Sequence, residues 1–325
     1  MDNIIDLTDL ITRIEKYNVR YNRKRQRSDS PKGEFIPLNL DMESLRACLE
    51  PLKQLNGLIG MDEIKINIID QILFYAQKLN TNEMMHTCLT GPPGVGKTTL
   101  GKILAKIYCS LGYLKTDKFR VIGKVDLVAG FIGQTSLKTN KVLKDSLGGV
   151  LFIDEAYSLS NGGGSDPDSF SKECIDTINQ FLSEHTSNFI LIIAGYREEL
   201  DRCFFSVNQG LRRRFPWNYN ITKYTINNLR DIFTHQVMEN GWTLDITPRE
   251  LSELFSKYSI LFNNNGGDTL ALYDKAKICH SRRVFGKPKS FKKVLNITDI
   301  SLAAELLKVH KNKVKSNEPP YGMYI

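Results

Sequence analysis

The feature of this sequence that most restricts its fold is a glycine-rich run of eight residues. The run is Gly91-Pro92-Pro93-Gly94-Val95-Gly96-Lys97-Thr98, and it fits the pattern G-x-x-x-x-G-K-[ST]. An apolar segment at 87–90 precedes it, and a helical pattern at 97–111 follows it. A loop between a strand and a helix is the context in which this pattern binds nucleotide phosphates. The sequence therefore predicts a phosphate-binding loop in an α/β fold.

Individual residues of this loop suit the role for separate physical reasons. The three glycines allow the backbone to curve around phosphates with its N–H groups pointing inward, and the following helix adds the positive end of its dipole. Lys97 is expected to neutralise charge on the β- and γ-phosphates, and the Thr98 hydroxyl is expected to bind Mg²⁺. The nucleotide-binding residues predicted here are Gly91, Pro92, Pro93, Gly94, Val95, Gly96, Lys97, Thr98 and Thr99.

Two adjacent carboxylates, Asp154 and Glu155, follow the apolar segment 150–153. That segment, Val-Leu-Phe-Ile, has the composition of a buried strand. Ligands of open parallel sheets bind beyond the carboxyl ends of the strands, so both acids are expected beside the phosphates. Asp154 suits the role of holding Mg²⁺ through water, and Glu155 suits the general base that activates the attacking water.

The nucleotide is predicted to be ATP, bound with Mg²⁺. A GTP-binding switch would need an Asn-Lys-x-Asp segment to recognise guanine. The nearest segment in this chain is Asn-Lys-Val-Leu at 140–143, which lacks the aspartate.

The order of patterns predicts two domains of different architecture. Apolar runs of strand length alternate with helical patterns up to about residue 217, and the remainder is mostly helical. Continuous apolar strands separated by helices imply a parallel sheet covered by helices on both faces. The expected divisions are an N-terminal extension with a basic linker at 1–50, a large α/β P-loop domain at 51–217, and a small helical lid domain with a basic tail at 218–325.

The N-terminal segments are expected to alternate between helix and linker. Apolar residues at helical spacing predict a short amphipathic helix over 1–17, and a second helix is predicted over 42–55. The basic stretch at 20–37 contains Pro and Gly and is expected to be a linker. Farther along the chain, a strand is expected near 119–125.

The net charge of +8 points to an acidic partner, such as nucleic acid. Within the first basic segment, Arg23–Arg27 has two interpretations: a nuclear address or nucleic-acid patch, or a solvated connector. No apolar run approaches the roughly 18 residues that span a bilayer, so no membrane partner is expected. The start of the chain lacks the layout of a signal peptide, and we expect an intracellular, cytoplasmic protein.

With the loop and the two acids in place, an ordered set of short segments resembles the CbbX/cfxQ group of AAA+ ATPases. That group includes stage V sporulation protein K and the red-type Rubisco activase. The resemblance covers most of the chain beyond the first 50 residues, and its segments are Gly57–Met61, Asp126–Thr135, Leu151–Tyr157, Ile193–Tyr196 and Asn208–Phe215. It implies a hexameric ring that hydrolyses ATP between subunits and pulls on a protein threaded through a central pore. It also adds Ile59 to the nucleotide-binding residues.

The resemblance assigns further roles to a phenylalanine loop and to two arginines. The segment 130–133, Gly-Phe-Ile-Gly, matches the pore-loop motif, with Phe131 and Ile132 expected to grip the threaded protein. The alternative is that Phe131 is a core residue in a turn, but flanking glycines argue against burial inside an element. Arg212 and Arg214 fall where the family supplies an arginine finger to the neighbouring subunit. Arg214 is the first choice for the finger and Arg212 the second, and their spacing does not decide between them. A solvated basic turn is the alternative.

Two positions depart from common AAA+ patterns. Tyr196 stands where many of these proteins have a polar sensor residue, although the CbbX group shares this form. The lid segment at 266–270, Gly-Gly-Asp-Thr-Leu, has no arginine where relatives tend to carry a sensor arginine. Arg282 and Arg283 lie several helical turns later. The sequence leaves open how the lid senses the nucleotide.

Three functions follow from these features. The leading prediction is an ATPase that couples hydrolysis to protein remodelling or unfolding in a homo-hexameric ring. The alternative is an AAA+ motor or loader that acts on nucleic acid, which the net charge and Arg23–Arg27 favour. A third is an ATP-gated assembly scaffold, which the missing lid arginine favours. The sequence does not identify the client.

Overall fold

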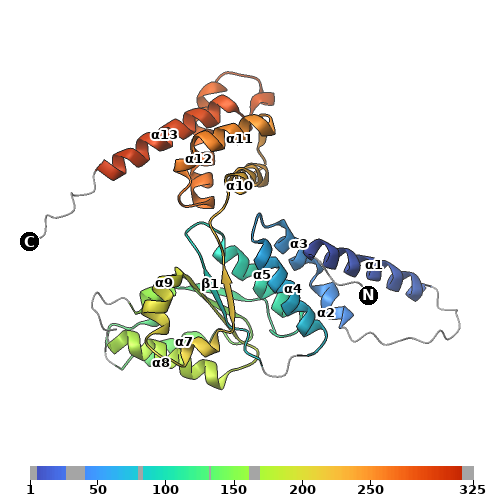
Figure 1. Ribbon diagram of the computed structural model, residues 1–325, viewed down its shortest axis with the longest axis vertical. Helices are drawn as coiled ribbons and strands as arrows, with labels where there is room; N and C mark the ends of the chain where they lie inside the picture. Colours follow the sequence, from blue (N-terminus) through green and yellow to red (C-terminus); the bar gives the residue numbers. More distant parts are fainter. Residues whose placement is uncertain (1–5, 27–40, 80–82, 132, 161–168, 317–325) are drawn as a thin grey trace, which may run out of the picture. The chain divides into compact units, whose positions relative to one another are not determined.

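The computed structural model describes residues 6–26, 41–79, 83–131, 133–160 and 169–316 (Figure 1). Internal contacts divide the chain into two compact units. The first unit comprises Met1–Gly91 and Lys97–Ile221, and the second comprises Pro92–Gly96 and Thr222–Ile325. The glycine-rich loop is therefore divided between the two units. Its middle, Pro92–Gly96, belongs to the second unit, and its two ends belong to the first.

The first unit is built on a five-stranded sheet in which every neighbouring pair of strands is parallel. The strand order is β2-β3-β4-β1-β5. The bounds are β1 (Thr87–Thr90), β2 (Phe119–Ile122), β3 (Val150–Ile153), β4 (Ile190–Gly195) and β5 (Trp217–Asn220). The three inner strands are completely buried, whereas β2 and β5 at the edges are partly exposed. Burial on both faces explains why the inner strands coincide with the apolar runs of the sequence.

Helices cover both faces of this sheet (Figure 1). Leu151 and Leu191 face one side, where they belong to a core with Ile175 and Ile178 of α8. On the other side, α5 packs against β3 and β4. The helices of this unit are α1 (Leu7–Gln26), α2 (Met42–Ala47), α3 (Leu49–Gly57), α4 (Asp62–Ala76), α5 (Lys97–Ser110), α6 (Lys124–Leu127), α7 (Thr135–Lys144), α8 (Ser169–Glu184) and α9 (Arg197–Glu199), with shorter turns η1 (Ala156–Leu159), η2 (Leu200–Phe205) and η3 (Leu211–Arg214).

The N-terminal segment differs from the sequence-based expectation. Helix α1 continues through Gln26, so the first part of the predicted linker at 20–37 is helical, and residues 27–40 lie outside the described residues. Arg, Lys and Gln are good helix formers, which favours this continuation. Leu10 of α1 is buried, and Glu15 forms an ion pair with Lys53 of α3 at 2.7 Å. The N-terminal extension therefore packs onto the first unit.

Two other predicted elements are shorter than expected. The helix predicted over 42–55 is divided into α2 and α3 at Cys48. Pro51 has no N–H to donate to the preceding turn, and proline is tolerated only in the first turn of a helix, so a new helix begins just before it. The strand predicted near 119–125 ends at Ile122, and the short helix α6 follows.

The first unit extends past the boundary expected after residue 217. Strand β5 pairs with β1 along its whole length, and the N–H of Ile221 donates to the carbonyl oxygen of Thr90 at 2.8 Å. Side chains along an edge strand are partly exposed, so β5 has no continuous apolar run in the sequence. The sequence pattern alone therefore gave no sign of this strand.

The second unit is mostly helical, as the sequence predicts. Its elements are α10 (Ile226–Glu239), α11 (Pro248–Lys257), α12 (Gly266–Arg283), α13 (Ile297–Ser316), the turns η4 (Ser259–Leu261) and η5 (Lys289–Phe291), and the parallel pair β6 (Thr243–Asp245) and β7 (Val294–Asn296). Arg283 donates to both carboxylate oxygens of the buried Asp299 at 2.9 Å, which fastens α12 to α13. Arg283 is therefore part of the packing of this unit. Within the described residues, no helix has the length and apolar character needed to cross a membrane.

Candidate active site

The carboxyl ends of β1, β4 and β3 lie next to one another in the sheet, and each leads into predicted site residues. Thr90 of β1 pairs with Gly195 of β4, and Ile153 of β3 pairs with Ile193. The N–H of Gly91 donates to the carbonyl oxygen of Gly195 at 3.2 Å. Since β4 separates β1 from β3, the residue after Gly195 lies between the start of the phosphate loop and the two carboxylates. That residue is Tyr196.

Lys97 is the first residue of α5, and its ammonium group is directed into the phosphate loop. Its Nζ donates to the carbonyl oxygen of Gly91 at 2.9 Å. Burial lowers the pKa of Lys97, and the negative charges of Asp154 and Glu155 act in the opposite direction. An anionic phosphate oxygen makes a stronger acceptor for this ammonium than a neutral carbonyl does. The geometry therefore suits Lys97 to a phosphate-binding role.

The two carboxylates follow β3 in a strained turn. Asp154 is partly buried and accepts a hydrogen bond at Oδ1 from the N–H of Glu155 at 3.0 Å, while Glu155 is exposed. Glu155 has φ +48° and ψ +48°, in the left-handed region that residues other than glycine rarely adopt. Such strain persists only where the surroundings determine it, and it is frequent at functional sites.

Tyr157 is a site residue that the sequence analysis missed. Its ring centroid is 6.0 Å from that of Tyr196, whose ring centroid is 5.9 Å from Nζ of Lys97. Burial raises the pKa of Tyr157 to about 12, and the charge of Glu155 and a side-chain hydrogen bond with it act in the same direction. The hydroxyl is therefore protonated near neutral pH. A tyrosine two residues after an acid has no specific meaning until the fold brings the two together.

The middle of the phosphate loop is held by three hydrogen-bond donors within the second unit. The pairs are Asn265 Nδ2 to the Pro93 carbonyl at 3.0 Å, the Gly266 N–H to the Gly94 carbonyl at 3.0 Å, and the Tyr224 hydroxyl to the Val95 carbonyl at 2.8 Å. Gly266 begins the segment in which the sequence shows no sensor arginine, and Asn265 directly precedes that segment. The sequence analysis did not identify Tyr224 or Asn265.

Phe131 is not a core residue, because 73% of its surface is exposed. It lies between α6 and α7, in the first unit. Thr135, at the start of α7, is completely buried, and its hydroxyl accepts a hydrogen bond from the N–H of Ala129 at 3.2 Å. The loop is thus anchored close to its exposed phenylalanine. Ile132, the other predicted pore residue, lies outside the described residues.

The two candidate finger arginines, both in η3, have different surroundings. Arg214 is half-buried, and its Nη2 donates to Ser183 of α8 at 2.9 Å. Arg212 is exposed, forms an ion pair with Asp201, and lies over the Phe205 ring at 4.4 Å. Arg212 is therefore the more accessible of the two.

Three other predicted nucleotide-binding residues have few specific contacts. Thr98 and Thr99 lie in the first turn of α5, where Thr98 is partly buried and Thr99 is exposed. Ile59 is partly buried in the connection between α3 and α4. Thr98 lies directly after Lys97, which suits a hydroxyl directed at the same phosphates.

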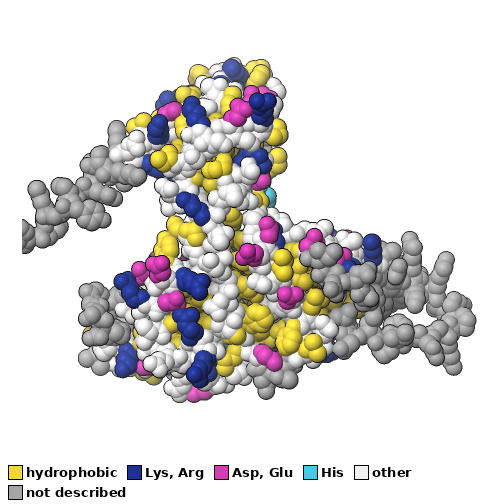
Figure 2. Space-filling model, in the orientation of Figure 1, with side chains coloured by type: hydrophobic (Ala, Val, Ile, Leu, Met, Phe, Trp, Pro, Cys, Tyr) yellow, Lys and Arg dark blue, Asp and Glu magenta, His cyan; other side chains and the backbone are white. Residues whose placement is uncertain are grey.

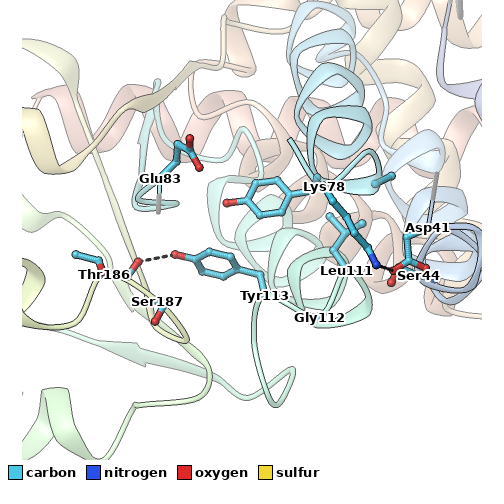
Figure 3. Close-up of a pocket in the computed structure, with 11 residues that line it drawn as sticks. Asp41, Ser44, Lys78, Glu83, Leu111, Gly112, Tyr113, Thr186 and Ser187 are labelled. Atoms are coloured by element: carbon cyan, nitrogen blue, oxygen red, sulfur yellow. Dashed lines mark hydrogen bonds and ion pairs between the residues drawn. The ribbon is translucent and has the colours of Figure 1, made fainter. Parts of the chain in front are cut away.

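A cavity of about 330 Å³ lies near the amino ends of β1 and β4 (Figure 3). Its lining includes Glu83, which precedes β1, and Thr186, which precedes β4. In the lining of the cavity, the Tyr113 hydroxyl donates to the carbonyl oxygen of Thr186 at 3.0 Å. Lys78 Nζ forms an ion pair with Asp41 Oδ2 at 3.7 Å. This cavity contains none of the predicted site residues, so it is separate from the phosphate site.

Comparison with known proteins agrees with this geometry. The sequence model of the family described as "ATPase family associated with various cellular activities (AAA)" matches residues 87–222. That range begins at β1 and includes both the phosphate loop and the two carboxylates. Among solved structures, the FIGL-1 AAA domain in complex with ADP has a TM-score of 0.57 at 17% identity, covering 82% of this chain and 90% of that one. The RuvB branch migration motor of Thermotoga maritima has a TM-score of 0.53 at 20% identity, covering 78% and 71%. These two likenesses establish the fold.

Sequence relatives define the group more narrowly. A cfxQ-like protein of Acanthamoeba polyphaga mimivirus is 37% identical over 86% of this chain and 70% of its own length. Stage V sporulation protein K of Bacillus subtilis is 38% identical over 59% of this chain and 61% of its own length. The chloroplastic ribulose bisphosphate carboxylase/oxygenase activase of Cyanidioschyzon merolae is 31% identical over 76% and 86%. The phosphate loop, the paired carboxylates and these relatives lead to one conclusion: the chain is an ATPase that belongs to the CbbX/cfxQ group of the AAA family.

Proposed function

We propose that the chain forms a homo-hexameric ring that uses ATP hydrolysis to remodel or unfold a protein client. The observation that carries this proposal is the exposed Phe131, held in a glycine-flanked loop whose base is anchored by buried Thr135. Single exposed apolar side chains are common on protein surfaces, so the proposal depends on the position of Phe131 within the segment that matches the pore-loop motif. An aromatic ring on a glycine-flanked loop suits contact with varied polypeptide segments. The relative named as a carboxylase/oxygenase activase supports a protein client, because its name describes action on an enzyme.

The proposed roles in hydrolysis follow from the charges at the site. Lys97 binds the β- and γ-phosphates, and Glu155 accepts a proton from the attacking water. The Thr98 hydroxyl and the Asp154 carboxylate are hard oxygen donors, which fit Mg²⁺. When bound, Mg²⁺ would neutralise phosphate charge. Tyr196 lies beside Lys97 and forms one wall of the phosphate site.

Arg212 is the proposed finger that completes the site of the neighbouring subunit. Its side chain is exposed, and its ion pair with Asp201 lies at the surface, where such pairs contribute little to stability. Breaking that pair to reach a phosphate would therefore cost little. Arg214 is half-buried and donates to Ser183, which favours a structural role. A finger in a ring supplies charge to the next subunit, so an isolated subunit should be nearly inactive.

Mixing two inactive variants tests the shared site. Glu155→Gln removes the base but keeps the finger, and Arg212→Ala removes the finger but keeps the base. Each alone should lose roughly 100-fold or more in ATP turnover. In a ring assembled from equal amounts, about one quarter of the interfaces would join an intact base to an intact finger, because the contacts are head-to-tail. Turnover should therefore recover to a similar fraction of wild type. No recovery in a mixture that light scattering shows to be hexameric would refute Arg212 as the finger.

The client class is tested with the ATP-bound Glu155→Gln ring. A protein client should remain bound to this ring and be absent when Phe131→Ala is added to it. The nucleic-acid alternative predicts ATPase stimulation by DNA that falls steeply with salt. On the face seen in Figure 2, described Lys and Arg side chains are interspersed with acidic and uncharged ones and form no continuous stripe. The protein-client proposal predicts no stimulation by single- or double-stranded DNA.

A further inference from the structure

Three consecutive peptide groups of the phosphate loop accept hydrogen bonds at their carbonyl oxygens. The donors are Asn265, Gly266 and Tyr224, all within the second unit. The carbonyls of Pro93, Gly94 and Val95 each accept one hydrogen bond, at 2.8 to 3.0 Å. In a trans peptide, the C=O and the following N–H point in opposite directions. The N–H groups of Gly94, Val95 and Gly96 are therefore turned away from the residues that hold the carbonyls. Backbone N–H groups in such a concave loop are the groups that bind phosphate.

Asn265, which donates to Pro93, combines a buried side chain with an unfavourable backbone conformation. It is completely buried, and its backbone has φ +48°, which is unfavourable for a residue with a side chain. Both ends of its amide are used: Nδ2 donates to Pro93, and Oδ1 accepts from the N–H of Tyr224 at 3.1 Å. The Asn265 side chain therefore contacts both the phosphate loop, at Pro93, and Tyr224, which is the residue that bonds to Val95. A strained backbone with a fully used buried amide points to a functional constraint at this position.

The two backbones approach so closely that only glycine fits at the contact. A Cβ at position 94 would overlap the carbonyl oxygen of Asn264, and a Cβ at position 266 would come within 2.9 Å of the carbonyl oxygen of Gly94. The turn at Asn265 and Gly266 is also bonded to α10, since Gln236 Nε2 donates to the carbonyl oxygen of Gly266 at 3.1 Å. The turn that carries the donors is therefore itself fastened to α10 within the second unit.

Tyr224 supplies the third donor from a different part of the unit. It is partly buried, and burial raises its pKa to about 12, so its hydroxyl keeps its proton near neutral pH. Its contact with Val95 orients the last peptide before Gly96. Gly96 itself has φ +88°, which glycine adopts without strain.

We propose that Asn265 and Tyr224 are positioning residues that hold the phosphate loop in its binding conformation, in place of a contact from a lid arginine. This inference rests on the proposed role of the loop in binding ATP phosphates. In this arrangement the second unit influences ATP through the loop backbone and needs no cation on the phosphates. Nucleotide affinity then depends on neutral side chains more than 120 residues away in sequence from the loop that they hold.

Tyr224→Phe and Asn265→Gly test the proposal by titration calorimetry with ATP, ADP and adenosine. Tyr224→Phe removes one hydroxyl and should weaken binding of ATP and ADP about three- to tenfold. Asn265→Gly keeps the positive φ accessible, loses the amide, and should weaken both nucleotides roughly tenfold or more. Adenosine has no phosphate, so its affinity should stay within about twofold of wild type. The matched control is Tyr258→Phe, which removes a tyrosine hydroxyl bonded to Glu305 elsewhere in the same unit.

Two results would overturn the proposal. One is wild-type affinity for ATP in Tyr224→Phe, which is a mild change that should fold normally. The other is an equal loss of affinity for ATP and adenosine in both variants, which would indicate general damage to the unit. Lys97→Ala is measured in parallel. If Lys97→Ala also bound ATP normally, the role of the loop would have failed, and not only the way in which it is held.

Discussion

The ring of Tyr157 lies directly against the α-carbon of Gly195, where an added Cβ would come within 2.9 Å of the Tyr157 Cδ1 atom. Gly195 is the last residue of β4, and Tyr157 belongs to the turn that follows Asp154 and Glu155. The glycine therefore leaves room for an aromatic ring between the ends of two strands. That ring carries the hydroxyl whose pKa the charge of Glu155 helps to raise.

Gly195→Ala should displace the Tyr157 ring. We expect a loss of roughly 1–3 kcal/mol in the free energy of unfolding, because overpacking forces side chains from their positions. ATP turnover should fall as well, since Tyr157 lies two residues after Glu155 and its displacement should disturb the position of that carboxylate. Urea denaturation and a steady-state ATPase assay measure the two effects. Gly57→Ala is the control, since no atom lies within 4 Å of a Cβ built there, and equal stabilities for the two variants would contradict the prediction.

Lys97→Ala should abolish detectable ATP binding. The ammonium lies in the phosphate loop, where its Nζ donates to the carbonyl oxygen of Gly91, and it is expected to neutralise charge on the β- and γ-phosphates. Isothermal titration calorimetry provides the measurement. Lys102→Ala, an exposed lysine on the same helix, should bind ATP as the wild type does. Tight ATP binding by Lys97→Ala would mean that the loop does not bind the phosphates.

Phe131→Ala should leave both folding and basal ATP hydrolysis nearly unchanged while it ends client processing. The side chain is 73% exposed, so its removal should alter the free energy of unfolding by no more than about 0.5 kcal/mol. Thermal melting and ATP turnover check the first two expectations. Leu137→Ala is a matched control, since Leu137 is 71% exposed on α7 and lies outside the glycine-flanked loop. A large drop in melting temperature would show that Phe131 supports the fold.

His86 should make the first unit sensitive to mild acid. Burial lowers its pKa to about 3, with a smaller effect from the positive charge of Arg214. Its Nδ1 accepts a hydrogen bond from the N–H of Leu191 at 3.1 Å, which a protonated ring could not do. As pH falls below about 6.5, the unfolded chain takes up a proton that the folded chain does not. The free energy of unfolding should then decline by about 1.4 kcal/mol per pH unit until pH approaches 3.

His86→Asn isolates this effect, because the Asn oxygen can still accept from Leu191. The variant should be less stable at pH 7, owing to its smaller volume, but its stability should fall less steeply between pH 6.5 and 4. Denaturation curves across this range provide the comparison. His235→Asn, at an exposed position, is the control and should follow the wild-type slope. Parallel slopes for His86→Asn and wild type would rule out His86 as the source.

The phosphate loop, the two carboxylates and the inner strands β3 and β4 can be read from the sequence alone. Each of these has a local signature. Gly91 to Thr98 requires glycines and a lysine at fixed spacing, and β3 and β4 are continuous apolar runs because both of their faces are buried. The edge strand β5 and the division of a helix at Cys48 have no such signature, since partial exposure and one proline weaken the pattern.

Which residues complete the site depends on the three-dimensional arrangement of the strands and turns. The strand order places β4 between β1 and β3, and this alone brings Tyr196 beside Lys97 and Tyr157 onto Gly195. The contact of Asn265 with Pro93 joins residues 172 positions apart. A hydrogen bond over that separation leaves no periodic trace in the sequence, because it depends on the path of the whole chain. The lid therefore appears from its sequence to lack a contact with the phosphate loop, although the fold provides one through neutral donors.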